Sequence, residues 1–250
     1  MINYAITSFR RPECITINAL LELGVPKSNI TIFLQNQEDY LAYSETWSDI
    51  NKVLIESSGL NTNRNNALKS YPDGSRIIIL DDDVLSFTRL AVINSEKCSS
   101  RKITDGAVFN EILESTFCEC ERVGCFMFGV SPTSNAMFAK SRLLRDGEYS
   151  INRLFQGGLI GHVKNDVYYD ETYSLMTDYE LQLRYYSMGQ ITLRRNDLSA
   201  NKKPNGNYFG GLYDTYRIPD KRKNDMERLA RQYRDFIEIK PDWSGLKQKV

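Results

Sequence analysis

The stretch Arg76-Ile-Ile-Ile-Leu-Asp-Asp-Asp-Val84 decides the fold. Its aliphatic half follows a turn-forming Pro72-Asp-Gly74 segment, and a short unbroken apolar run of this kind is typical of a strand buried on both faces. Three successive carboxylates cannot continue into the core, because burying an unpaired charge is very unfavourable. We therefore expect them where the strand emerges, at its carboxyl end, which is the edge where open α/β sheets bind ligands.

The spacing of the carboxylates predicts a metal site. On extended backbone, Asp81 and Asp83 are two residues apart and point roughly the same way. Two hard oxygen donors at one place suit a divalent cation, and such a cation commonly accompanies a bound diphosphate. The alternative is an acidic turn whose charges are simply solvated. We favour a site for a metal ion with a nucleotide.

The composition describes an ordinary globular chain. It has 250 residues, of which 41% are hydrophobic and 26% charged, enough to bury a sizeable core. No apolar run approaches the roughly 18–20 residues that cross a bilayer. The amino-terminal stretch lacks a basic segment before its apolar residues, so we expect no signal peptide. We expect no membrane contact and a cytoplasmic location.

The cysteines do not form a recognisable metal or disulfide pattern. There are five of them, an odd number. Cys118, Cys120 and Cys125 lack zinc-ligand spacing, and the one histidine, His162, lies far away in sequence. This pattern favours reduced thiols in an intracellular protein.

The formal charge is balanced but unevenly distributed. The chain carries 32 basic and 32 acidic residues, yet residues 184–250 hold 15 Lys or Arg against 8 Asp or Glu. A basic carboxyl-terminal third beside an acidic site suggests an anionic partner. A solvated basic helix explains the same pattern.

The elements alternate in a Rossmann-like order. Apolar periodicity predicts strands and helices joined by short connections, which is typical of right-handed parallel crossovers. The expected strands are at residues 4–7, 30–34, 52–56, 76–80, 125–130 and 190–193. The expected helices are at residues 14–24, 38–43, 60–68, 104–122, 177–188 and 219–238.

Basic and amide side chains lie near the acidic strand in this order. Arg10 and Arg11 leave the first strand at the same edge, where guanidinium groups bind phosphates or bases; pairing with nearby glutamates is equally consistent. Arg64 and Asn65 lie early on a helix, a position from which they could reach a nucleotide.

The ordered motifs resemble those of the GT-A glycosyltransferases. The sequences Ser8-Phe-Arg-Arg11, Arg64-Asn65 and Ile79-Leu-Asp-Asp-Asp83 carry the resemblance, and the last contains a DxD motif. Downstream motifs resemble a narrower set, the phage and TET-associated glycosyltransferases. These motifs are Phe128-Gly-Val-Ser-Pro132, Gly157-Gly-Leu-Ile-Gly161, Asp178-Tyr-Glu-Leu-Gln-Leu-Arg184, Gly189-Gln-Ile-Thr-Leu-Arg194 and Gly210-Gly211.

The resemblance implies a fold and a reaction. The fold is α/β, a mixed GT-A sheet flanked by helices, with a helical appendage at the carboxyl terminus. The GT-A domain would span residues 1–217, with a donor half at about 1–100 and an acceptor half at about 101–217, and residues 218–250 would form the helix and tail. The implied reaction moves a sugar from a nucleotide-sugar, a UDP-sugar in our prediction, to hydroxymethylated pyrimidines in phage DNA, inside the host cytoplasm.

The resemblance also implies site residues. Mn²⁺ or Mg²⁺ would be held by Asp81 and Asp83, with His162 as a further candidate ligand. Asp178 is the expected base and Glu180 its substitute, although a residue at this point also suits helix capping. The donor would be bound by residues from several elements, namely Ser8, Arg10, Arg11, Arg64, Asn65, Asp81, Asp82, Gly157 and Gly158.

The same sequence features also fit other functions. The loop at residues 202–211 combines lysines, aromatics and glycines that suit closure over a donor or binding of a flipped base, and a plain surface loop fits it equally. The acceptor could be a glycan, lipid or protein, and related folds catalyse nucleotidyl transfer. A non-enzymatic alternative is an inactive nucleic-acid-binding module.

Overall fold

The central strand of the molecule is the one that the acidic stretch predicts. The computed structural model describes residues 1–250 except 57–58, 157, 204–214, 216–217 and 250. Strand β4 (Arg76–Asp81) buries its side chains from Ile77 to Leu80 to 1% exposure or less. Each such side chain contributes about 1.5–3 kcal/mol by leaving water. This burial explains why the aliphatic run occupies the middle of the fold.

The main sheet has eight strands in the order β3-β2-β1-β4-β9-β7-β10-β8. The pairs β1 with β2, β1 with β4, β2 with β3, and β7 with β10 are parallel, whereas β9 and β8 run antiparallel to their neighbours. Besides β4, the strands are β1 (Ile2–Ser8), β2 (Ile30–Leu34), β3 (Asn51–Leu54), β7 (Met127–Val130), β8 (Tyr149–Ile151), β9 (Leu159–Val163) and β10 (Leu193–Arg195).

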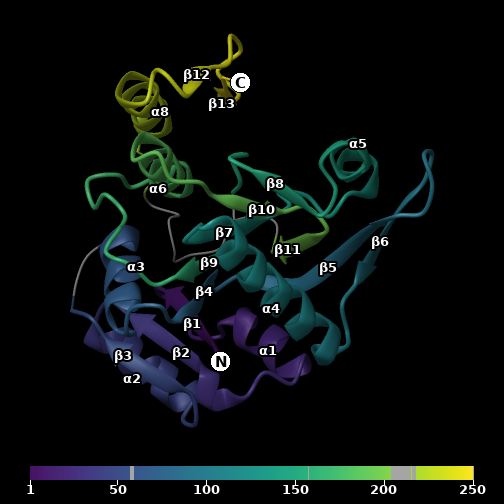
Figure 1. Cartoon of the computed structure of the whole chain (residues 1–250). Coiled ribbons are helices and arrows are strands. Elements are labelled where there is room, and N and C mark those ends of the chain that lie inside the picture. Colours follow the sequence, from purple (N-terminus) through teal and green to yellow (C-terminus); the bar gives the residue numbers. More distant parts are fainter. Residues whose placement is uncertain (57–58, 157, 204–214, 216–217, 250) are drawn as a thin grey trace.

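Helices cover both faces of this sheet (Figure 1). Alternate strand residues point to opposite faces, so Ile78 and Leu80 join one core while Ile77 and Ile79 join the other. The first core includes residues of α1 (Ile15–Glu22), α2 (Gln37–Thr46) and α4 (Gly106–Val123), and the second includes residues of α3 (Leu60–Lys69) and α6 (Thr177–Ser187). The expected fold class, a mixed α/β sheet flanked by helices, is therefore confirmed.

Helix α4 shows how local sequence sets the ends of an element. Asp105 accepts hydrogen bonds from the N–H groups of Ala107 and Val108, and Gly124 ends the helix with a φ of 71°. An aspartate cap contributes about 1 kcal/mol, and a glycine takes this left-handed conformation without a Cβ clash. The predicted span 104–122 is thus nearly correct.

Several elements were absent from the sequence prediction, among them a second sheet and one helix. Strand β5 (Val84–Val92) follows the acidic turn and pairs with β6 (Cys98–Lys102) and β11 (Leu198–Lys202) in a second, three-stranded sheet. Helix α5 (Ala136–Asp146) packs against β5 and β6. Strand β6 is mainly polar, whereas β5 and α5 expose some of their apolar residues, so the apolar residues do not mark one buried face and periodicity gives little signal there.

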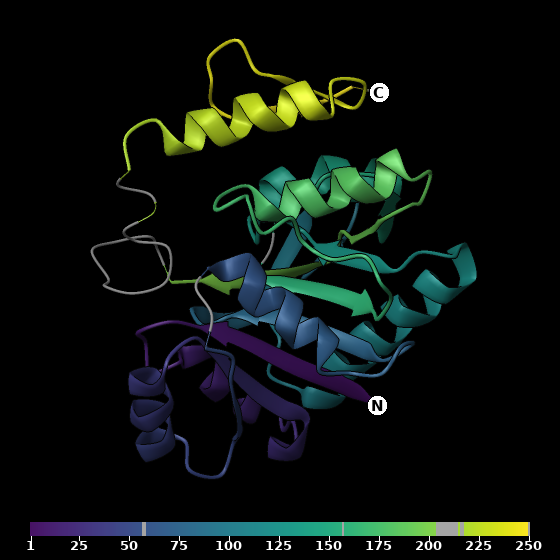
Figure 2. The same cartoon turned by 90° about the vertical axis from the view of Figure 1, so that its left-hand side faces the viewer.

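The carboxyl-terminal appendage packs on α6. Helix α8 (Lys221–Gln232) runs alongside α6 (Figure 2), and Leu229 and Tyr233 cluster with Leu183 and Tyr186 of that helix. The chain then forms a hairpin of β12 (Ile237–Ile239) and β13 (Leu246–Gln248), where the sequence had predicted a longer helix and an extended tail.

The cysteines and the apolar character of the helices concern two expectations from composition. All five cysteines are free thiols. No helix in the described part of the chain has both the length and the apolar character of a membrane-spanning segment.

Candidate active site

The acidic residues form a turn at the carboxyl end of β4. Strand β4 ends at Asp81. The turn consists of Asp82 and Asp83, and β5 begins at Val84. Asp83 therefore does not lie on extended backbone. The expectation that Asp81 and Asp83 point the same way because both belong to a strand is thus wrong. The edge itself is the predicted one, because Ser8 at the end of parallel strand β1 lies beside the turn.

Asp82 is tied to the end of β1. Its Oδ2 accepts a hydrogen bond from the hydroxyl of Ser8, and its Oδ1 pairs with Nη1 of Arg11 at 2.8 Å. The Ser8 hydroxyl also bonds the hydroxyl of Tyr43, which accepts the backbone N–H of Arg11 at 3.0 Å. Burial raises the pKa of Asp82, and Arg11 opposes that rise. Ser8 and Arg11 thus reach the acidic turn, as predicted, and Tyr43 of α2 is an unpredicted partner.

Asp81 lies between two cations. Its Oδ1 is 3.0 Å from Nη2 of Arg64, and its Oδ2 pairs with Nζ of Lys202 at the end of β11. Burial alone would raise the pKa of Asp81, but Lys202 and Arg64 outweigh it and lower the pKa to about 2. Asp81 therefore carries its charge at neutral pH.

Arg64 connects the acidic turn to helix α6. Its side chain is 3% exposed, and its Nη1 donates to Oγ1 of Thr177 at 2.9 Å and to Oδ1 of Asp178 at 2.8 Å. The guanidinium carbon also lies 5.3 Å from the centre of the Tyr169 ring. Burial lowers the pKa of Arg64, yet Asp178 and Asp81 raise it above its ordinary value. One buried cation thus brings the predicted base within reach of the DxD carboxylates.

Asp178 does not act as the cap of α6. The N-cap position is Met176, which makes no side-chain capping bond and has a left-handed φ of 58°.

Backbone conformations with positive φ also occur near Arg11. Arg10, directly before it, has a φ of 55°, and Cys14, three residues after it, has a φ of 30°. Such conformations are unfavourable for residues with a Cβ and concentrate at functional sites.

Asp83 is the least compensated carboxylate of the turn. Nη1 of Arg11 lies 3.6 Å from its Oδ2, and no donor among the described residues reaches its buried Oδ1. Burial, then the charge of Asp81, raises the pKa of Asp83 to about 6, although Lys202 and Arg11 oppose the rise. An oxygen of this kind is well suited to bind an added cation.

The acidic turn accommodates a divalent cation only if its own cations rearrange. Asp83 offers an oxygen without a donor, but both oxygens of Asp81 are engaged by Lys202 and Arg64. No set of three or more His, Cys, Asp or Glu side chains in the described ranges is placed to hold a metal ion. Asp81 and Asp83 therefore suit a cation that displaces Lys202.

His162 is not placed as a metal ligand. It is 2% exposed on β9, and its Nε2 lies 3.3 Å from the hydroxyl of Tyr169. Burial, with a smaller effect of Arg64, lowers the pKa of His162 to about 3. His162 is thus a neutral histidine in the core beside Tyr169, a position that does not favour the role of metal ligand that the resemblance implied.

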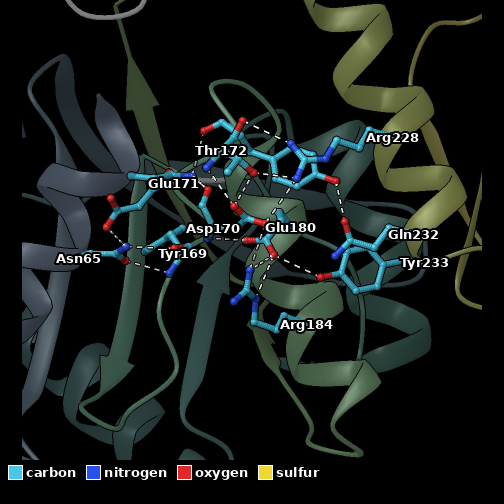
Figure 3. Close-up of polar contacts among 12 residues, drawn as sticks. Asn65, Tyr169, Asp170, Glu171, Thr172, Glu180, Arg184, Arg228, Gln232 and Tyr233 are labelled. Carbon is cyan, nitrogen blue, oxygen red and sulfur yellow. Dashed lines mark hydrogen bonds and ion pairs between the residues drawn. The ribbon is translucent and has the colours of Figure 1, made fainter. Parts of the chain in front are cut away.

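Asn65 has a structural role instead of the predicted contact with the donor. Its side chain is 2% exposed and bonds the backbone of Tyr169 through both amide atoms, at 2.8 and 2.9 Å. Its Nδ2 also donates to Oε1 of Glu171 (Figure 3). Asn65 thus holds the loop that leads into α6, which indirectly positions Asp178.

Glu180 faces the carboxyl-terminal appendage. Its Oε1 accepts bonds from Arg184 at 2.6 and 3.0 Å and from the hydroxyl of Tyr233 at 3.2 Å, and its Oε2 accepts the N–H of Asp170 (Figure 3). The side chain is 0% exposed. A fully buried carboxylate with these partners is not placed to meet an acceptor, so the structure favours a structural role for Glu180 over the predicted role of substitute base.

The remaining predicted donor residues have different outcomes. Arg10 is exposed, and its backbone N–H donates to Oδ2 of the buried, unpredicted Asp39 at 3.2 Å. Gly158 lies under Lys202, where an added Cβ would be 2.7 Å from Cε. Gly157 and most of the predicted closing loop, from residue 204 onward, lie outside the described residues.

This combination of fold and site is typical of α/β enzymes that bind nucleotides at the carboxyl edge of their strands. Residues 1–211 match the family model described as TET-Associated Glycosyltransferase. The chain therefore belongs to the TET-associated glycosyltransferase family, which confirms the resemblance found in the sequence and makes the protein a glycosyltransferase.

Two other comparisons add no functional information. A search of curated proteins gives no match. A solved structure of 4-diphosphocytidyl-2C-methyl-D-erythritol synthase from Anaerococcus prevotii is similar at 10% sequence identity and a TM-score of 0.28, covering 47% of this chain and 75% of that one.

Proposed function

We propose that this glycosyltransferase moves a sugar from a UDP-sugar to the hydroxyl of a hydroxymethylated pyrimidine in phage DNA. The observation that carries the proposal is the position of Arg64, which pairs with Asp81 at the acidic turn and with Asp178 on α6. A single buried side chain thereby places a candidate donor site and a candidate base next to each other.

The donor half is assigned to the edge around the acidic turn. Arg11, Arg64 and Lys202 supply positive charge close to the Asp81–Asp83 turn, where a diphosphate would bind. Asp81 and Asp83 would hold Mn²⁺ or Mg²⁺ once Lys202 has moved. Such a cation supplies Lewis-acid stabilisation of the departing diphosphate when bound.

The acceptor half is assigned to the start of α6. Asp178 is partly exposed, at 19%, and faces the acidic turn through Arg64. In an inverting transfer, Asp178 would take the proton of the acceptor hydroxyl as its oxygen attacks the anomeric carbon. The glycosidic bond to the diphosphate breaks in the same step, and UDP leaves.

The DNA acceptor is supported by the family and by charge. The family name associates these glycosyltransferases with TET proteins, and residues 184–250 carry 15 basic against 8 acidic residues. An excess of basic residues in this part of the chain favours a polyanionic acceptor over a neutral glycan or lipid.

The proposal is tested by UDP release. Purified protein with Mn²⁺ is incubated with a panel of UDP-sugars, with and without duplex DNA containing hydroxymethylated cytosine or uracil. We expect UDP to appear with one donor only when the modified DNA is present, and labelled sugar to enter the DNA.

The Asp81→Asn variant serves as the inactive control, with a loss of at least a hundredfold. Release of pyrophosphate would instead indicate nucleotidyl transfer, and transfer to lipid or protein alone would exclude the DNA acceptor. DNA binding without release from any donor, unchanged in Asp81→Asn, would identify an inactive binding module.

A further inference from the structure

Lys202 stands where an added cation would be expected. Its ammonium group pairs with Oδ2 of Asp81. Burial lowers the pKa of Lys202, but the charges of Asp81 and Asp83, and more weakly that of Asp178, raise it above its ordinary value. Among the described residues, Asp81 is the carboxylate whose contact with this ammonium group is direct, and the charges of Asp83 and Asp178 act on it from farther away.

The position of Lys202 is built into the fold. Strand β11 pairs with β5 so that Lys202 lies opposite Val84, directly after the acidic turn, and a register shift occurs between Asn201 and Lys202. The next backbone N–H, that of Lys203, donates to the carbonyl oxygen of Asp83 at 2.9 Å. The end of β11 thus contacts the turn twice, through the side chain of Lys202 and through the backbone N–H of Lys203.

Gly158 leaves room for the lysine side chain. Its carbonyl accepts the N–H of Asp81 at 3.3 Å, and a Cβ at this position would lie 2.7 Å from Cε of Lys202 and 3.0 Å from Cγ2 of Val84. A larger residue here would therefore crowd the lysine side chain and require it to shift.

The two cations of Asp81 differ in how firmly they are held. Arg64 is 3% exposed and has further partners in Thr177 and Asp178, whereas Lys202 is 36% exposed. The Lys202–Asp81 pair is therefore more open to water than the Arg64–Asp81 pair, and water screens it more strongly. Of the two cations, Lys202 is the easier one to separate from Asp81.

We propose that Lys202 is an exchangeable cation of the donor site, which occupies the metal position at Asp81 before loading and transfers to the diphosphate of the donor when a divalent cation binds. This inference rests on the proposed function for its second half only. The first half, competition between the ammonium group and a divalent cation for Asp81, needs no sugar transfer.

The test measures Mn²⁺ binding to the full-length protein by electron paramagnetic resonance, without any donor. Removing the competing ammonium group in Lys202→Met should tighten Mn²⁺ binding at least tenfold. The matched control is Lys102→Met, because Lys102 lies in the same small sheet and pairs with Glu22 at 3.4 Å, away from the acidic turn. That variant should bind Mn²⁺ as the wild type does.

A second variant keeps the lysine and displaces it. Gly158→Ala should also tighten Mn²⁺ binding, since the new methyl group crowds the side chain of Lys202. Circular dichroism confirms that each variant is folded. Unchanged or weaker Mn²⁺ binding in both folded variants overturns the competition, as does the absence of Mn²⁺ binding in every protein tested.

The second half is tested with UDP as the probe, at saturating Mn²⁺. Lys202→Met should bind UDP at least tenfold more weakly than the wild type, because the diphosphate loses its ammonium partner. Equal UDP affinity would overturn the transfer of Lys202 to the diphosphate. A failure of the glycosyltransferase proposal is distinguishable, since it would appear as no UDP release while the Mn²⁺ effect persists.

Discussion

Asp178 and Glu180 lie two residues apart on α6 but belong to different polar networks. Glu180 is fully buried between the catalytic part and the appendage, and both of its oxygens accept hydrogen bonds, from Arg184, Tyr233 and the Asp170 N–H. Asp178 is 19% exposed and meets the acidic turn through Arg64. Two carboxylates in the first turn of one helix thus belong to different networks.

The network around Glu180 is suited to a structural role, and the network around the acidic turn is suited to binding a ligand. Around Glu180 each carboxylate oxygen has donors, which is what a stable buried charge requires. Around the acidic turn, the four carboxylates of Asp81, Asp82, Asp83 and Asp178 face three cations, and Asp83 keeps a buried oxygen that no described donor reaches. A network that is incomplete in this way is ready for a ligand.

The largest expected effect is on the reaction. Replacing Asp178 by Asn removes the proposed base but leaves an oxygen that Arg64 can still bond, so kcat should fall about 10²–10⁴-fold while stability changes by about 1–2 kcal/mol. UDP release at saturating substrates and urea denaturation measure the two quantities. A kcat within about fivefold of the wild type would mean that another group removes the proton.

The opposite pattern is expected for Glu180→Gln. It leaves the half-buried Arg184 without its main partner, so the free energy of unfolding should fall by about 2–4 kcal/mol, while kcat of the folded protein changes less than about threefold. Asp166→Asn, at a residue whose side chain is 88% exposed, is the control and should alter stability by less than about 0.5 kcal/mol. A large loss of kcat without loss of stability would reverse the assignment.

A smaller effect should distinguish Asp83 by its pH dependence. Its pKa is about 6 in the folded protein, against an ordinary 3.8, because of burial and the charge of Asp81. Between about pH 4 and pH 6 the folded protein keeps a proton that the unfolded chain has lost, so this group lowers the free energy of unfolding as pH rises through that window. At neutral pH the carboxylate is therefore destabilising.

Asp83→Asn removes this penalty. The variant should be more stable than the wild type by about 1–3 kcal/mol at pH 7.5, and the difference should shrink toward zero near pH 4. Urea denaturation at several pH values measures it, with Asp166→Asn as a control whose difference from the wild type stays constant. If the difference in the free energy of unfolding between Asp83→Asn and the wild type did not change with pH, the pKa of Asp83 would not be raised in the folded protein.

Periodicity predicted the amino-terminal half best. The strand at 30–34 and the helix beginning at residue 60 match β2 and α3, because these elements bury one regular apolar pattern against the sheet. Strand β6 was missed because it is mainly polar, and helix α5 because it buries only Ala139 and Leu143 while Met137, Phe138 and Leu144 are exposed. The strand predicted at 190–193 is shifted to β10 (Leu193–Arg195). Arg194 and Arg195 are buried in it, although charged residues normally indicate an exposed segment.

The sequence alone determined where the charges of the site gather. A buried aliphatic run that meets three aspartates can end only at the edge of a sheet. Arg11 follows β1, which pairs with β4, and Arg64 lies on the helix that follows β3. The tertiary structure decided the roles of Asn65, Glu180 and Lys202, because each depends on a partner more than 50 residues away in the chain. Pairing of distant elements is set by packing and strand register, which local sequence does not encode.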